Sequence, residues 1–236
     1  MAGFTVITFS VQVGTPGFAI ARMVAAQLGY NYYDSQITAK AAELSGLSSE
    51  GVAGDGQGLV ERIVTRLFAA NLYEEELPPS MVGPEPHVLE ASLRRLASPW
   101  YRGYLEDVVR QIADRGNAII VGHGSQVLLN GAVLKVLIHG SMNIRAERLA
   151  AARNTTIEEA TAAASELDRS REDFFQQAYG VDWLDHSLYD LSLNSDHLSV
   201  GLATRVILTA AEPEPAIPPS TDLLDTLPSQ TSPLDE

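Results

Sequence analysis

Hydrophobic positions along the chain follow two different spacings. Short runs of apolar and β-branched residues, typical of buried strands, alternate with longer stretches in which apolar residues recur every three or four positions. Strands are expected at residues 4–10, 30–33, 118–122, 133–138 and 189–194. Helices are expected at residues 18–28, 36–44, 99–115, 143–152, 157–177 and 198–209, with an amphipathic segment at 59–73 and loops at 46–58 and 74–86.

Strands separated by helices of this length predict a parallel sheet covered on both faces, which is a three-layer α/β fold. The length of 236 residues suits a single α/β domain, and we place it at residues 1–210. Ligands of such folds bind beyond the carboxyl ends of the strands. The first strand-to-helix turn is therefore the first place to look for chemistry.

The last 26 residues, 211–236, differ in composition from the rest of the chain. They hold six acidic residues, no basic residue and six of the twelve prolines, a composition that cannot sustain a helix or a central strand. We expect a disordered acidic tail. Its leucines, Leu223, Leu224, Leu227 and Leu234, hint at a docking motif, but a solvated tail is the favoured interpretation.

Charge and composition narrow the classes of partner. The net charge of −14, from 30 acidic and 16 basic residues, argues against general binding to nucleic acids or anionic membranes. Removing the −6 of the tail leaves −8 on the body. The absence of cysteine excludes disulfides and thiolate metal sites. No apolar run approaches the roughly 18 residues of a spanning helix, so the expected location is the cytoplasm.

The first turn, residues 11–17, contains Val-Gly-Thr-Pro-Gly at positions 13–17. Such a turn can direct backbone N–H groups and a helix dipole at a phosphate. A working P-loop also supplies a lysine and a serine or threonine, and here those positions fall on Gly17 or Phe18 and on Phe18 or Ala19. Considered alone, the turn fits a phosphate cradle and a plain structural turn equally well.

Four blocks in the same order resemble the cytidylate kinase-like family, a branch of the nucleoside monophosphate kinases among the P-loop NTPases. The opening ITFSVQVGTPGFAIA resembles the family's I-S-R-Q-x-G-S-G-G-R-E-I-A, and LGYNYYDS at 28–35 resembles its acceptor segment. IIVGHG at 119–124 is similar to a V-x-G-R-G strand end. ELDRSRE at 166–172 with YDLSLN at 189–194 is similar to D-R-x-R-E … Y-D-L-x-I-N-T.

The resemblance implies a phosphotransferase that moves the γ-phosphoryl group of ATP, with Mg²⁺, to CMP, dCMP or a related monophosphate. It implies an arginine-containing lid near residues 153–183, because arginine forks grip phosphate oxygens and a closed lid excludes water. Arg153, Arg169 and Arg171 are thereby assigned to phosphates as catalytic residues. The nucleotide-binding assignments are Gly14, Thr15, Gly17, Asp34, Ser35, Gly122, His123 and Asp168, of which Asp168 would orient an arginine or contact the acceptor.

Several of these assignments have a structural alternative. The arginines can pair with nearby glutamates on an exposed helix surface, Asp34 can cap the next helix, and His123 can be a buried, hydrogen-bonded histidine. His123 also stands where the family has an arginine, and histidine is only partly charged at neutral pH. No residue is assigned to a protein-held metal, and the oligomeric state is left open.

Three hypotheses follow. The first is the phosphotransferase with small-molecule nucleotides as partners. The second is a nucleotide-binding pseudo-kinase, since loss of one preorganised charge at a transition state typically costs about 10²–10³ in rate. The third is a dinucleotide-binding oxidoreductase, because Asp34 lies 20 positions after Gly14, although the G-x-G-x-x-G pattern is missing.

Overall fold

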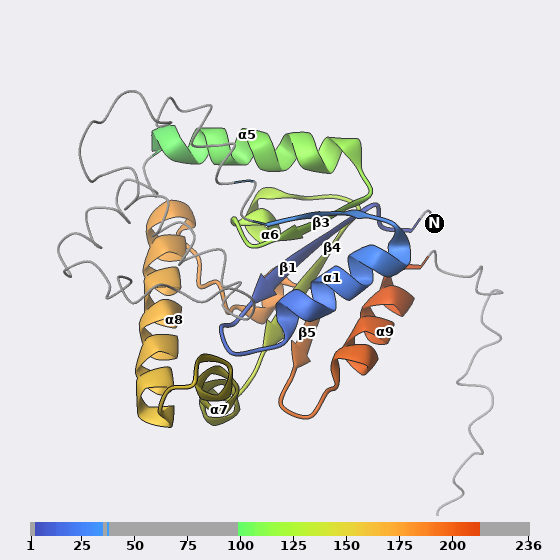
Figure 1. Ribbon diagram of the computed structural model, residues 1–236. Coiled ribbons are helices and arrows are strands. Elements are labelled where there is room, and N and C mark those ends of the chain that lie inside the picture. The colour runs from blue at the N-terminus through green and yellow to red at the C-terminus, as the bar shows by residue number, and fades with distance from the viewer. Residues whose placement is uncertain (1–2, 35–36, 38–98, 213–236) are drawn as a thin grey trace, which may run out of the picture.

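The computed structural model describes residues 3–34, 37 and 99–212 (Figure 1). Ser35, the segments expected between residues 38 and 98, and the tail from residue 213 lie outside the described residues.

Five parallel strands form the sheet in the order β2-β3-β1-β4-β5. The central strand β1, Val6–Val11, pairs with β3, Ala118–Val121, on one side and with β4, Val133–His139, on the other. The outer strands are β2, Asn31–Tyr33, and β5, Leu191–Asn194. Every residue of β1 and β3 is buried, as expected for strands that are covered on both faces.

One face of the sheet is covered by α1, Gly17–Leu28, and α9, Val200–Ala211, which pack side by side (Figure 1). Alternate residues of β1, among them Ile7 and Phe9, join these helices and α7, Met142–Arg153, in one hydrophobic cluster. The opposite face carries α5, Pro99–Arg115, and the short α6, Ser125–Leu128. The two covered faces confirm the predicted α/β class.

The long helix α8, Ile157–Tyr179, contributes to both clusters. Its first half buries Ala160, Ala164 and Leu167 beside α7, and its second half buries Phe174 and Phe175 on the α5 side. In Figure 1, α8 stands across the end of the sheet at which the arrow of β1 points. The helix therefore lies at the carboxyl ends of the strands, where a ligand of this fold binds.

Local sequence signals explain the helix boundaries. Gly29 and Gly180 adopt the left-handed conformation that ends α1 and α8. The start of α8 is a capping box, in which Thr156 and Glu159 satisfy each other's backbone amides. The 3₁₀ helix η1, His186–Leu188, begins at Asp185, whose carboxylate accepts the Ser187 amide. None of the described helices is both long and apolar enough to cross a membrane.

Candidate functional site

The turn between β1 and α1 is buried and tightly packed. Gly14 has φ +85°, and a Cβ there would lie 2.5 Å from the carbonyl oxygen of Arg145. A Cβ on Gly17 would lie 2.5 Å from the Val11 side chain. The Thr15 hydroxyl donates a hydrogen bond to the Gln12 carbonyl at 2.7 Å, which closes the turn on itself. Both glycines are therefore required for packing, whether or not the turn binds a phosphate.

The amino terminus of α1 retains its capacity to bind an anion. Pro16 occupies the N-cap position without a side-chain cap, and the first turn of the helix contains no acidic residue. The amides of a first helical turn have no partner inside the helix, and the dipole places partial positive charge there. The end of α1 thus supplies donors that suit phosphate oxygens.

Arg145, in the first turn of α7, is buried against this turn. Its Nη1 donates to the Val13 carbonyl at 3.1 Å, and its Nε donates to the Gly140 carbonyl at 3.0 Å. Its Nη2 lies 2.8 Å from Oδ2 of Asp168 on α8, with the two side chains 4% and 20% exposed. This ion pair is the contact expected of an aspartate that orients an arginine, and Oδ1 of Asp168 has no hydrogen-bond partner among the described residues.

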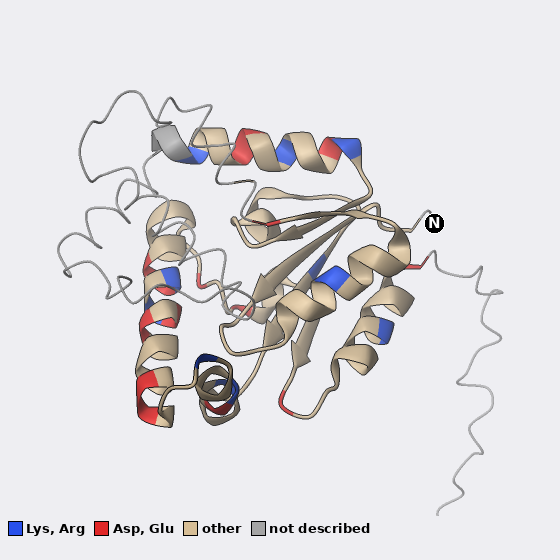
Figure 2. Ribbon diagram, in the orientation of Figure 1, with Lys and Arg blue, Asp and Glu red and all other residues tan. Residues whose placement is uncertain are grey.

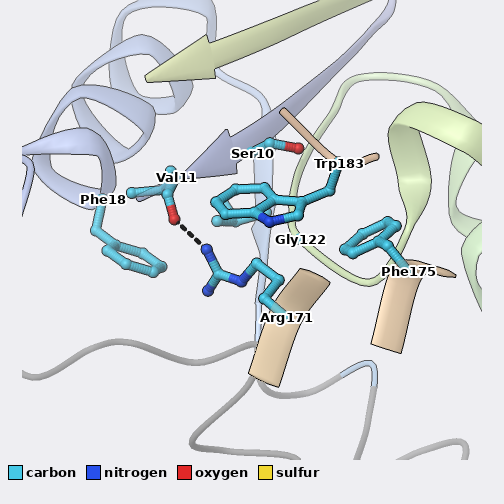
Figure 3. Close-up of a pocket in the computed structure, with 8 residues that line it drawn as sticks. Ser10, Val11, Phe18, Gly122, Arg171, Phe175 and Trp183 are labelled. Atoms are coloured by element: carbon cyan, nitrogen blue, oxygen red, sulfur yellow. Dashed lines mark hydrogen bonds between the residues drawn. The ribbon is translucent and has the colours of Figure 1, made fainter. Parts of the chain in front are cut away.

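Arg171, three residues further along α8, reaches the same strand end. Its Nη1 donates to the carbonyl of Val11, and its guanidinium lies 4.8 Å from the centre of the Trp183 ring (Figure 3). Burial lowers the pKa of Arg171, but an arginine stays charged in a protein. Among the described residues, these two guanidiniums and the Asp168 carboxylate together carry one net positive charge beside the glycine turn. An anion at this place would relieve the repulsion between the two arginines.

A small cavity opens beside Arg171 at the ends of β1 and β3 (Figure 3). Its volume is about 20 Å³, which is room for one water molecule. A nucleotide would enter this cavity only if the side chains around it moved. The residues that line it are Ser10, Val11, Phe18, Val121, Gly122, Arg171, Phe175 and Trp183.

The acceptor side predicted at Asp34 and His123 is also well packed. His123 is fully buried at φ +61°, and its Nε2 donates to the Asp34 carbonyl at 2.9 Å. Burial lowers the pKa of His123 to about 4, so the ring is neutral at pH 7 and cannot replace the family's arginine as a cation. The Asp34 carboxylate lies 3.4 Å from the Tyr32 hydroxyl, and Arg22 lies over the Tyr32 ring at 5.6 Å.

The other predicted site residues differ in how close they lie to the glycine turn. Gly122 follows β3 at φ +77° and lines the cavity. Arg169 is exposed on α8, and helical geometry turns it about 200° away from Arg171. Arg153 ends α7, about 12 Å along the helix axis from Arg145. The structure thus brings Asp168 and Arg171 to the glycine turn and does not bring Arg169 there, so the phosphate roles of Arg153 and Arg169 stay predictions.

Arg145 was not among the residues assigned to the site from the sequence. One sequence signal was available. An arginine in the first turn of a helix interacts unfavourably with the helix dipole, so its presence there indicates a favourable contact elsewhere. Tyr189 was quoted only as part of a motif. Its hydroxyl donates to the Trp183 carbonyl at 2.6 Å and so holds the wall of the cavity.

The predicted lid, residues 153–183, is anchored at its carboxyl end. Phe174, Phe175 and Trp183 are 1–3% exposed, as expected for packing residues. Exposing three large aromatic side chains would cost about 2–3 kcal/mol each, so α8 cannot swing out freely as a whole. Movement of a lid remains a prediction.

The chain is similar to known proteins in both sequence and fold. The sequence profile of the Cytidylate kinase-like family matches residues 6–197. A cytidylate kinase from Methanoregula boonei is 28% identical over 72% of this chain and 92% of its own length. One from Methanopyrus kandleri is 29% identical over 44% of this chain, and the match spans 59% of that relative. A crystal structure of an uncharacterized protein from Eubacterium ventriosum superposes with a TM-score of 0.56 at 15% identity, covering 86% of this chain and 96% of that one, and supports the fold alone.

Proposed function

Because the chain belongs to the cytidylate kinase-like family, with an α/β fold of the P-loop NTPase type, we propose that it transfers the γ-phosphoryl group of ATP to CMP, dCMP or a related nucleoside monophosphate. The observation that carries the proposal is the convergence of Arg145 and Arg171 on the carbonyls of the first glycine turn. Both cations come from the segment after β4, and both are buried where a polyphosphate would lie.

Phosphoryl transfer mainly requires that the protein position the two nucleotides and compensate the negative charge of their phosphates. An oxygen of the acceptor phosphate attacks the γ-phosphorus while the bond to the bridging oxygen breaks, and ADP carries that oxygen away. The amides at the start of α1 would hold the donor phosphates. Arg145 and Arg171 would compensate the charge that a P-loop lysine compensates elsewhere, and Asp168 would fix Arg145 in place.

The described residues do not fit a protein-held magnesium ion. The hydroxyl position of the turn is apolar, and no group of three or more His, Cys, Asp or Glu side chains in the described ranges could hold a metal. Mg²⁺ is commonly bound through substrate phosphates and water. We therefore place it as part of the ATP complex that is the substrate.

A second candidate, a nucleotide-binding pseudo-kinase, is favoured by one observation. Each buried guanidinium already donates to a backbone carbonyl, so a phosphate must compete with that bond. The turn lacks the lysine and the hydroxyl that most P-loops supply. Binding through backbone amides tolerates these losses better than catalysis does.

The test is a coupled assay of ADP formation with CMP, dCMP, UMP and AMP as acceptors. We expect turnover with a cytidine acceptor, reduced about 10²–10³-fold by Arg171→Met, and unchanged by Arg110→Ala on α5. Arg110 is a matched control because it is an exposed arginine whose nearest carboxylate, Glu106, lies at 3.7 Å. Nucleotide binding without turnover for any acceptor would support the pseudo-kinase instead.

A further inference from the structure

The outward faces of α1 and α9 form an apolar surface on the α1 side of the sheet. Four large hydrophobic side chains are exposed among the described residues, and three of them lie on these two helices. Met23 on α1 is 39% exposed, and Leu202 and Val206 on α9 are 39% and 37% exposed. The two helices pack side by side, so their exposed stripes belong to one face of the molecule. A helix with so few polar residues ordinarily packs against a second element.

The same surface is cationic in a strongly acidic protein. Neither α1 nor α9 contains an acidic residue, and Arg205 is the charged residue of α9 (Figure 2). Arg22, the charged residue of α1, lies over the Tyr32 ring on the β2 side. Arg205 is exposed and makes no ion pair within the described part of the chain. Leu202, Arg205 and Val206 are three and four positions apart, so they share one side of α9. The surface therefore suits an occupant that is both apolar and acidic.

A second copy of the chain suits it less well. In a symmetric dimer each surface would meet its own copy, which would bring Arg205 near the Arg205 of the other molecule. Like charges brought together at an interface cost several kcal/mol. The occupant must supply carboxylates, which this surface lacks.

We propose that residues 222–227 of the same chain, Asp-Leu-Leu-Asp-Thr-Leu, dock on the α1–α9 surface. The segment supplies Leu223, Leu224 and Leu227 for the apolar stripe, and two aspartates, either of which could pair with Arg205. It belongs to the part of the chain that carries six acidic residues and no basic residue. Its charge and apolar content complement the surface.

The covalent connection brings the segment within reach. The helix α9 ends at Ala211, and residues 213–221 join the described part to the segment. Nine residues span at most about 30 Å, whereas the 12 residues of α9 rise about 18 Å. The segment can thus return along α9 to Leu202. A tether of this length gives an effective concentration in the millimolar range, so a weak contact suffices.

Disulfide trapping in the full chain tests the proposal, because the chain has no cysteine of its own. We expect Val206→Cys with Leu224→Cys to close an intramolecular disulfide about tenfold faster than Arg110→Cys with Leu224→Cys. Arg110 is a suitable control because it is exposed on α5, on the opposite face of the sheet. Leu202→Cys with Leu224→Cys provides a second docked pair. Adding Arg205→Glu should slow trapping several-fold, and Arg205→Lys should not.

Two results would overturn the proposal. Equal rates for the α9 pairs and the α5 pair would mean that the tail has no preferred position. A disulfide that joins two molecules, seen as a doubled mass without reductant, would assign the surface to a second copy. The proposal does not depend on the phosphotransferase, since trapping is measured without nucleotide.

Discussion

Replacement of Arg145 by methionine tests the network that joins α7, α8 and the glycine turn. Methionine retains the helix propensity and part of the apolar stem of arginine, so the main loss is the guanidinium. The Val13 and Gly140 carbonyls lose a donor, and Asp168 loses its ion-pair partner. Removal of one partner of a buried pair costs about 3–5 kcal/mol. Because Asp168 is 20% exposed, we expect the lower end, about 3 kcal/mol of unfolding free energy.

The assay is equilibrium denaturation by urea, followed by far-UV circular dichroism. Arg110→Ala serves as the control and should cost less than about 0.5 kcal/mol, as is typical of an exposed pair within a helix. Arg145→Met with Asp168→Asn should recover about 1 kcal/mol or more of the loss, because the unpaired carboxylate is removed. A cost below about 1 kcal/mol for Arg145→Met would refute the view that this arginine holds the turn.

Three further predictions follow from single residues. Burial lowers the pKa of His123 to about 4 in the folded protein, against 6.5 when unfolded, so the unfolded state gains its proton first as the pH falls. The wild type should therefore lose about 2 kcal/mol of unfolding free energy from this group between pH 7.5 and 5.0. His123→Asn should not show this loss. Gly14→Ala should cost about 1–3 kcal/mol more than Gly180→Ala in thermal unfolding. Both glycines have positive φ, but the added Cβ would lie 2.5 Å from the Arg145 carbonyl oxygen at position 14 and would meet no atom within 4 Å at position 180. Arg169→Ala should leave stability within about 0.5 kcal/mol yet lower turnover about 10²-fold; unchanged turnover would remove Arg169 from the phosphate site.

The sequence predicted the described elements well because their signals are local. The helix expected at residues 99–115 has those bounds, and that expected at 157–177 extends two residues further, to Tyr179. The buried strands carry continuous apolar runs that need no partner to be recognised. The four-residue helix α6 was missed because it is shorter than the window in which a helical period can be counted.

The candidate site was less predictable because it depends on contacts between distant residues. Nothing local in the sequence joins Arg145 to Val13 or Arg171 to Val11, since those bonds follow from the strand order and from the path of α8. The resemblance assigned three arginines to phosphates; the structure brings Arg171 to the glycine turn, and the phosphate roles of all three stay predictions. Arg169 was chosen from its motif, although its position on α8 places it on the exposed side.

The central claim is that buried guanidiniums and the first glycine turn together form a polyphosphate site. Isothermal titration of ATP with Mg²⁺ into the wild type and into Arg171→Met tests it most directly, because binding is measured whether or not the protein turns over. The account predicts binding to the wild type that weakens about tenfold or more in the variant. Equal affinity for both proteins, or no binding to either, would contradict it.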